Sequence, residues 1–305
     1  MAIPRVRADA LTSREFNERF AAPNLPVILT HATSTWRANR EWVRGDGTPD
    51  VKRLADLFGD HVVTVHGSKG AARETTVATF AQWWLQRQPG DDEWRYLKDW
   101  HVAHGAPEYN AYTVPACLGE DWLNEHWLSE AESAATSDGG DHRFVYVGPS
   151  GSRTALHADV LFSYSWSVNI AGRKRWRLVP AEQRTLVSDG ATRPLAAALA
   201  ALPAATPIDL VQLPGEVLFV PSGWYHEVEN LDDALSINHN WMNAYNIPWA
   251  LVRITGACLV SKAKHTLEPP ATTRARARLP RDAISRNIMH ARPSSRAPLR
   301  CLPCW

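Results

Sequence analysis

The run TALHADVLFSYSWSVNIAGRKRW occupies residues 154–176, near the middle of the chain. Its β-prone residues place His157 and Asp159 two positions apart. Side chains alternate between the faces of a strand, so these two project from one face, about 7 Å apart along the strand. This spacing suits two ligands of one metal ion, and it equally suits one buried hydrogen-bonded histidine–aspartate pair.

Short β-prone runs separated by turn residues continue on both sides of this stretch. Several short strands at close spacing predict a sandwich or barrel rather than parallel βαβ units. The runs, from residue 143 onward, are RFVYVG, TALHADV, SYSWSVNI, KRWRLV, DLVQLP, EVLFVP, HEVENL and ALSINHNW.

Residues 1–142 have a mixed helical and strand pattern, which predicts an α/β region packed on a β core over 143–262. We expect a helix over 11–20 capped by Thr12 or Ser13, and a strand over 25–30. A second helix should end at Gly59 and lead into a strand over 61–66. A third helix over 76–88 and a strand over 93–102 complete the region.

Residues 263–305 lose the apolar periodicity and become rich in arginine and proline. This composition predicts a disordered basic tail. Such a tail can contact nucleic acid, but composition favours a solvated tail without a defined partner.

The composition argues against several classes of function. A net charge of +1 over 305 residues gives no overall attraction to nucleic acid or to an acidic membrane. We find no apolar run of membrane-spanning length and no secretory leader, so no membrane association is expected. The four cysteines contain one CxxC pair, at 301–304, and form no disulfide framework or four-ligand zinc site. A reducing compartment, the cytoplasm or also the nucleus, fits best.

A third metal-binding candidate, His226, lies about seventy residues further on in VPSGWYHEVEN. Two histidines and one carboxylate on the strands of a barrel can occupy one face of Fe(II) and leave three positions open. These three residues alone do not exclude the plain alternative, a histidine hydrogen-bonded by its neighbouring aspartate.

Lys174 follows a tight turn at Gly172 and begins a returning strand. A lysine that points into a barrel can pair with a dicarboxylate that also chelates the metal. Arg173 and Arg175 alternate to the other face, where we expect an exposed basic turn.

The order TxxHxD, GRKRW, VPSGWYHEVEN and SINHNW resembles the JmjC (cupin-type) oxygenases, which depend on 2-oxoglutarate and Fe(II). The runs NLPVILTHATSTWRANREW and LADLFGDHVVTV are similar to the leading region of the hydroxylase branch, so the likeness covers about residues 11–250. It implies a mainly β (α+β) fold, with a double-stranded β-helix or jelly-roll core and an α/β N-terminal region.

The resemblance also implies residue roles. Fe(II) would be the metal, with 2-oxoglutarate and O2 as co-substrates. Lys174, Thr154 and Tyr96 would hold the distal carboxylate of 2-oxoglutarate, and Asn238 would support it from the last strand. Asn240 competes with Asn238 because the strand register is open, and His239 between them is expected to be a packed residue. The implied iron ligands are His157, Asp159 and His226.

The segments YLKDWH and SYSWSVNIAGRKRW are most similar to a branch that hydroxylates a lysine of a translation termination release factor. The resemblance therefore implies a protein lysyl C-hydroxylase. Candidates for an anchor of the substrate ammonium are Asp99, Asp232 and Asp233. The basic tail stands where the family usually has further helices, so the sequence leaves the oligomeric state open.

Three rival functions remain. Another JmjC activity would be hydroxylation of Asn, Asp, His or a tRNA base, or demethylation of N-methyl-lysine. A zinc hydrolase could use the same three ligands, although Lys174 and Thr154 argue against it because a hydrolase needs no dicarboxylate anchor. A non-catalytic cupin-type module would only bind a ligand or partner.

Overall fold

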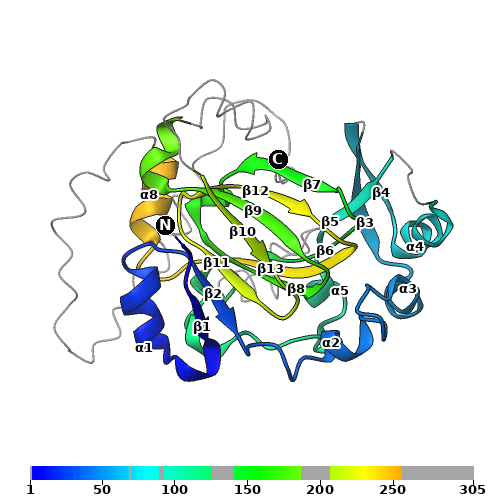
Figure 1. Cartoon of the computed structure of the whole chain (residues 1–305), viewed down its shortest axis with the longest axis horizontal. Helices are drawn as coiled ribbons and strands as arrows, with labels where there is room; N and C mark the ends of the chain where they lie inside the picture. Colours follow the sequence, from blue (N-terminus) through cyan, green and yellow to red (C-terminus); the bar gives the residue numbers. More distant parts are fainter. Residues whose placement is uncertain (1, 69, 89–92, 126–140, 187–206, 256–305) are drawn as a thin grey trace.

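The computed structural model describes residues 2–68, 70–88, 93–125, 141–186 and 207–255. In this part of the chain the strands form two sheets (Figure 1). The larger sheet consists, in spatial order, of β1 (Arg5–Arg7), β2 (Val27–Thr30), β11 (Val217–Val220), β8 (Tyr164–Ala171), β13 (Ala234–Trp241), β6 (Arg143–Gly148), β5 (Arg95–Trp100), β3 (Val62–Gly67) and β4 (Gly70–Thr76). The smaller sheet consists of β10 (Ile208–Gln212), β9 (Lys174–Val179), β12 (Tyr225–Asn230) and β7 (Arg153–His157).

The helical segments are short and lie mostly in the N-terminal half of the described chain. The α-helices are α1 (Ser13–Phe16), α2 (Arg37–Glu41), α3 (Val51–Phe58), α4 (Val77–Gln86), α5 (Val102–Gly105) and α8 (Ile247–Thr255). A π-helical segment, η2 (Asn17–Ala21), extends α1. The 3-10 segments are η1 (Ala8–Ala10), η3 (Pro107–Tyr109), η4 (Ala116–Leu118), η5 (Val160–Phe162) and η6 (Ala181–Leu186).

The eight strands from β6 to β13 form the jelly roll that the sequence predicts. Along the chain they pass between the two sheets: β6, β8, β11 and β13 belong to the larger sheet, and β7, β9, β10 and β12 to the smaller. Every pairing among them is antiparallel. The fold prediction, a mainly β protein with a jelly-roll core, is confirmed.

The N-terminal strands extend the larger sheet at both of its ends. β2 pairs with β11 on one side, and β5 pairs with β6 on the other. Figure 1 shows α3 and α4 beside β3 and β4 at one end of the molecule, and α1 and α8 near the opposite end. These strands join the core sheet directly, while the proposed division of the chain at residue 142 stays a prediction.

In the N-terminal region, the residues that the sequence suggests as helix caps do cap their helices. Thr12 caps α1, and its side chain and that of Glu15 form a reciprocal capping box. Asp50 caps α3, which ends at Gly59. We did not predict β1, β4, α2 or α8, because each is short or lacks clear periodicity. The predicted tail over 263–305 lies outside the described residues. None of the described helices has the length and hydrophobicity needed to span a membrane.

Two strands of the larger sheet are buried on both faces. All eight residues of β8 are buried, as are seven of the eight in β13. In β8, Tyr164 and Trp166 pack in the main hydrophobic core, while Ser165 and Ser167 line a cavity between the sheets. Small polar and large apolar residues therefore alternate, which leaves a polar inner wall inside an apolar shell.

The turn between β8 and β9 depends on Gly172, whose φ of +74° favours glycine. A Cβ here would overlap the carbonyl oxygen of Asp233 and lie 2.9 Å from Cα of Ala234. This close approach sets the start of β9 and with it the position of Lys174.

We expect Gly172→Ala to lower the free energy of unfolding by at least about 2 kcal/mol, because it adds steric overlap to backbone strain. Denaturant unfolding measures this. Gly151→Ala is the matched control, since Gly151 has a φ of +81° but nothing within 4 Å of its added Cβ. An equal loss in both variants would mean that the overlap at Gly172 costs nothing.

Candidate metal centre and co-substrate site

The seven side chains that the sequence assigns to iron or to 2-oxoglutarate all line one cavity between the two sheets. The cavity wall consists of Tyr96, Tyr146, Thr154, His157, Asp159, Ser165, Ser167, Lys174, Trp176, His226, Val228, Asn238 and Asn240. Strands from both sheets contribute, so the site lies inside the jelly roll.

Three of these residues bring their ligand atoms together. One side-chain nitrogen each of His157 and His226 and one carboxylate oxygen of Asp159 all lie within 4.8 Å of one another. In the described part of the chain this is the group of histidine, cysteine and acidic residues that meets the geometry of a metal site.

Strand pairing explains how residues seventy positions apart meet. His226 on β12 is directly opposite His157 on β7, and the centres of the two rings are 4.2 Å apart. The register shifts just after His226, between His226 and Val228. The expectation that Asp159 belongs to the same strand as His157 is wrong, because β7 ends at His157. Asp159 follows in an extended conformation as the residue before η5.

Main-chain carbonyls fix the tautomers of both histidines. Nδ1 of His157 is 2.9 Å from the carbonyl oxygen of Ala155, and Nδ1 of His226 is 3.2 Å from that of Trp224. A carbonyl only accepts, so in each neutral ring Nδ1 carries the proton and Nε2 keeps its lone pair. A hydrogen bond at the ring nitrogen that does not bind the metal orients a metal-binding histidine.

The electrostatics of the three residues also fit a divalent metal. Burial and the neighbouring His226 lower the pKa of His157 to about 3, although Asp159 opposes the shift. The imidazole is therefore neutral near pH 7 and able to bind a metal. Ser165 Oγ donates to Oδ2 of Asp159 at 2.7 Å, which leaves Oδ1 for the ion. Two imidazoles and one carboxylate suit Fe(II) with three positions open.

Lys174 lies on the inner face of the barrel. Its side chain is buried, and Nζ donates to Ser236 Oγ at 2.7 Å and to Tyr96 Oη at 3.4 Å. Burial, and then the charge of Lys98, lower the pKa of Lys174 to about 7. The neighbours Arg173 and Arg175 instead reach the surface, where they pair with Asp232 and Glu229. The expected alternation of these three residues is confirmed.

Tyr96 and Thr154 approach the same end of the cavity. Burial raises the pKa of Tyr96 well above its ordinary value, and hydrogen bonds with Asn230 and Thr154 oppose the shift. The phenol therefore stays protonated and can donate. Together with the ammonium of Lys174, these hydroxyls form a set of donors suited to a carboxylate.

The last strand places both candidate asparagines on the cavity wall. Asn238 Nδ2 donates to Ser236 Oγ at 3.2 Å, and Asn240 Nδ2 donates to Ser163 Oγ at 3.0 Å. Asn238 thus shares a partner with Lys174, whereas Asn240 bonds elsewhere.

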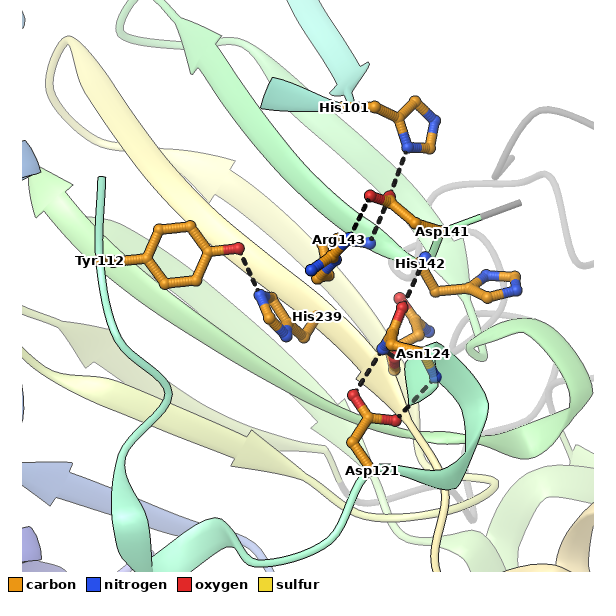
Figure 2. Close-up of polar contacts among 9 residues, drawn as sticks. His101, Tyr112, Asp121, Asn124, Asp141, His142, Arg143 and His239 are labelled. Atoms are coloured by element: carbon orange, nitrogen blue, oxygen red, sulfur yellow. Dashed lines mark hydrogen bonds and ion pairs between the residues drawn. The ribbon is translucent and has the colours of Figure 1, made fainter. Parts of the chain in front are cut away.

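His239 is not part of the cavity wall, and its polar partner in Figure 2 is Tyr112. Its ring stacks on Trp166 at 4.0 Å, and its Nε2 is 2.6 Å from Tyr112 Oη. Figure 2 also shows Asp141 held by His101 and Arg143, and Asn124 bridging Asp121 to the backbone of His142. The expectation that His239 is a packed residue is confirmed.

Sequence reasoning missed Ser165, Ser236 and Tyr146, which contact or neighbour the predicted site residues. A signal was present: serine and asparagine occupy every second position in SYSWSVN and in SINHN. In strands buried on both faces, such alternation indicates a polar inner wall.

Comparisons with known proteins agree with the fold. The sequence profile of the Cupin-like domain family matches residues 13–247. The "Arginine-specific demethylase JMJ20" of Arabidopsis thaliana is 37% identical over 81% of this chain and 58% of its own length. The human "2-oxoglutarate and iron-dependent oxygenase JMJD4" is 37% identical over 78% of this chain and 61% of its own length.

The name of a more distant relative lists two activities. The "Bifunctional arginine demethylase and lysyl-hydroxylase psr-1" of Caenorhabditis elegans is 27% identical over 81% of this chain and 62% of its own length. The chain thus spans between 58% and 62% of the length of these three curated relatives.

Proposed function

We propose that this chain, which belongs to the Cupin-like domain family, is a 2-oxoglutarate- and Fe(II)-dependent oxygenase. The observation that carries the proposal is the meeting of His157, Asp159 and His226 in the cavity that also contains Lys174. A metal triad alone would suit a zinc hydrolase. An inward ammonium beside the triad provides the partner that a dicarboxylic co-substrate needs.

The residues of the site have different roles in the proposed reaction. His157, Asp159 and His226 hold the metal, and the carbonyls of Ala155 and Trp224 keep both imidazoles in the binding tautomer. When bound, Fe(II) supplies the redox chemistry that couples decarboxylation of 2-oxoglutarate by O2 to oxidation of a substrate C–H bond.

The opposite end of the cavity holds the co-substrate. Lys174 and the hydroxyls of Tyr96, Thr154 and Ser236 surround one place for its distal carboxylate. Asn238 positions Ser236 from the same strand. Lys174, Tyr96 and Ser236 are buried, and a buried setting strengthens each charge-assisted hydrogen bond.

The charge of Lys174 gives a pH dependence with a defined sign. With its pKa lowered to about 7, Lys174 is protonated below that pH and loses its charge above it. A bound carboxylate favours the ammonium, so binding above pH 7 requires proton uptake. We expect the dissociation constant for 2-oxoglutarate to rise from pH 6.5 to 8.5, by up to about tenfold per pH unit above 7.

Calorimetric titration of the metal-loaded protein at several pH values measures this dependence. Lys174→Arg serves as the control, because a guanidinium stays charged over the whole range and should flatten the profile. A flat profile for the unmodified protein would contradict the assignment.

For the substrate we propose a lysine side chain of a protein, with a translation termination release factor as the target. Support comes from the likeness to JMJD4 proteins and from the lysyl-hydroxylase in the name of psr-1. Arginine demethylation is the second candidate, since JMJ20 is equally identical to this chain. A cytoplasmic location is part of the same proposal.

Mass spectrometry of release-factor peptides incubated with the protein, Fe(II) and 2-oxoglutarate tests the proposal. Gain of one oxygen atom on an unmodified lysine, with equal succinate, is the expected result. Formaldehyde release from methyl-arginine peptides, without oxygen gain on lysine, would favour the second candidate. Absence of succinate in every reaction would rule out both.

A further inference from the structure

Asp99 is a carboxylate in an unusual backbone position next to the cavity. It lies in β5, where the pairing with β6 shifts register between Leu97 and Trp100. Its φ is +53°, a left-handed conformation that is uncommon outside glycine and that Asn and Asp adopt most readily. Such local strain often marks a functional position.

Tyr146 connects Asp99 to the site. Its hydroxyl donates to Oδ1 of Asp99 at 2.7 Å, and its ring belongs to the cavity wall that carries the metal triad. The rings of Tyr96 and Phe144 lie on either side of Tyr146, with centres 6.1 Å and 6.3 Å away. Asp99 itself is partly exposed and is not sealed in the core.

The carboxylate of Asp99 differs from others around the barrel in its partners. Asp232, Asp233 and Asp141 are each paired with an arginine. For Asp99 the described part of the chain provides a hydrogen bond from a neutral hydroxyl and no ion pair. Among the described residues this carboxylate therefore has no cationic partner.

The other charges near Asp99 are two buried ammonium groups. Nζ of Lys98 lies 5.0 Å from the centre of the Tyr96 ring, and Nζ of Lys174 lies 6.0 Å from that centre and 5.9 Å from the centre of the Tyr146 ring. The carboxylate held by Tyr146 has the opposite charge, so it is the group beside these rings that attracts a cationic side chain.

We propose that Asp99, positioned by Tyr146, receives the cationic end of the substrate side chain and so selects lysine or arginine over neutral residues. This inference rests on the proposed function and deepens it. Ammonium and guanidinium groups share the required chemistry, and both occur in the substrates named for the relatives JMJ20 and psr-1.

The test compares peptide libraries that differ in one fixed central residue. Lysine is paired with its neutral analogue norleucine, and arginine with citrulline. The readout is the ratio of kcat/KM for the charged over the neutral library, measured as succinate formation. We expect the unmodified protein to favour one charged library by about tenfold or more. The pair that shows the preference identifies the cation.

In Asp99→Asn this ratio should fall close to one. Asparagine tolerates the left-handed conformation, so the backbone is preserved while the charge is lost. Asp232→Asn is the matched control, because it removes the same charge from an arginine-paired carboxylate on the surface and should keep the ratio. A ratio near one in the unmodified protein, or an unchanged ratio in Asp99→Asn, would overturn the proposal.

Equilibrium binding of the same libraries to the full chain separates this proposal from the proposed function. Binding gives a charged-to-neutral ratio even if no succinate forms. Loss of selectivity in Asp99→Asn without turnover would uphold the role of Asp99 and reject the oxygenase. Normal turnover without charge selectivity would uphold the oxygenase and reject the role of Asp99.

Discussion

Asp159→Ala is expected to abolish conversion of 2-oxoglutarate to succinate, with a loss of more than about a hundredfold. Asp159 is the carboxylate among the three ligands, and its removal leaves the two imidazoles. Loss of an outer partner of a metal ligand already costs about 10- to 100-fold in metal affinity or activity, so loss of the ligand itself should cost more. Metal content after anaerobic loading and succinate formation are the two measurements.

Ser165→Ala provides a graded comparison for Asp159→Ala. Ser165 donates to Asp159 but supplies none of the three ligand atoms, so we expect an intermediate loss of about 10- to 100-fold. Circular dichroism of both variants checks that the fold is retained. Full turnover by Asp159→Ala would show that the metal does not depend on this carboxylate.

Lys174→Ala should raise the dissociation constant for 2-oxoglutarate by about 10- to 100-fold while leaving metal affinity nearly unchanged. A buried, charge-assisted hydrogen bond to a carboxylate contributes about 1.5 to 3 kcal/mol. Lys174 is separated from the metal triad and contacts the hydroxyls of Ser236 and Tyr96 instead. Titrations with 2-oxoglutarate and with Mn(II) measure the two affinities independently.

Arg175→Ala is the matched control for Lys174→Ala. It removes a cation from the next position of the same strand, where the side chain reaches solvent and lies 3.6 Å from Glu229. We expect its affinity for 2-oxoglutarate to be unchanged. Equal effects in the two variants would mean that Lys174 acts through general charge and not through contact.

Local sequence signals were sufficient for the jelly roll and for the inward direction of Lys174, whereas Thr154, Tyr96 and Asn238 were implied by the family resemblance. Turn residues divide the strands, and the alternation of Arg173, Lys174 and Arg175 fixes which side chain is buried. The capping residue Thr12 likewise marks the start of its helix.

Features that depend on pairing between distant strands could not be read from the sequence. The direct opposition of His157 and His226 is a matter of register, and a shift of one residue would turn one ring to the other face. The same holds for Ser236, which meets Lys174 only because β13 and β9 face each other across the cavity. The bulge that turns Asp99 toward Tyr146 has no local signal at all, since it is a mismatch between two strands.

The position of β7 has a consequence for the stability of the protein. β7 is the outermost strand of the smaller sheet and pairs only with β12 in the described part of the chain. Two of the three ligands lie in or directly after it, and the third lies on β12. A metal bound there joins an edge strand to its neighbour, so metal binding and attachment of the strand are thermodynamically linked. Removal of the metal would therefore weaken the attachment of β7 to β12. A weakly attached edge strand is exposed to proteolysis and to pairing with other chains.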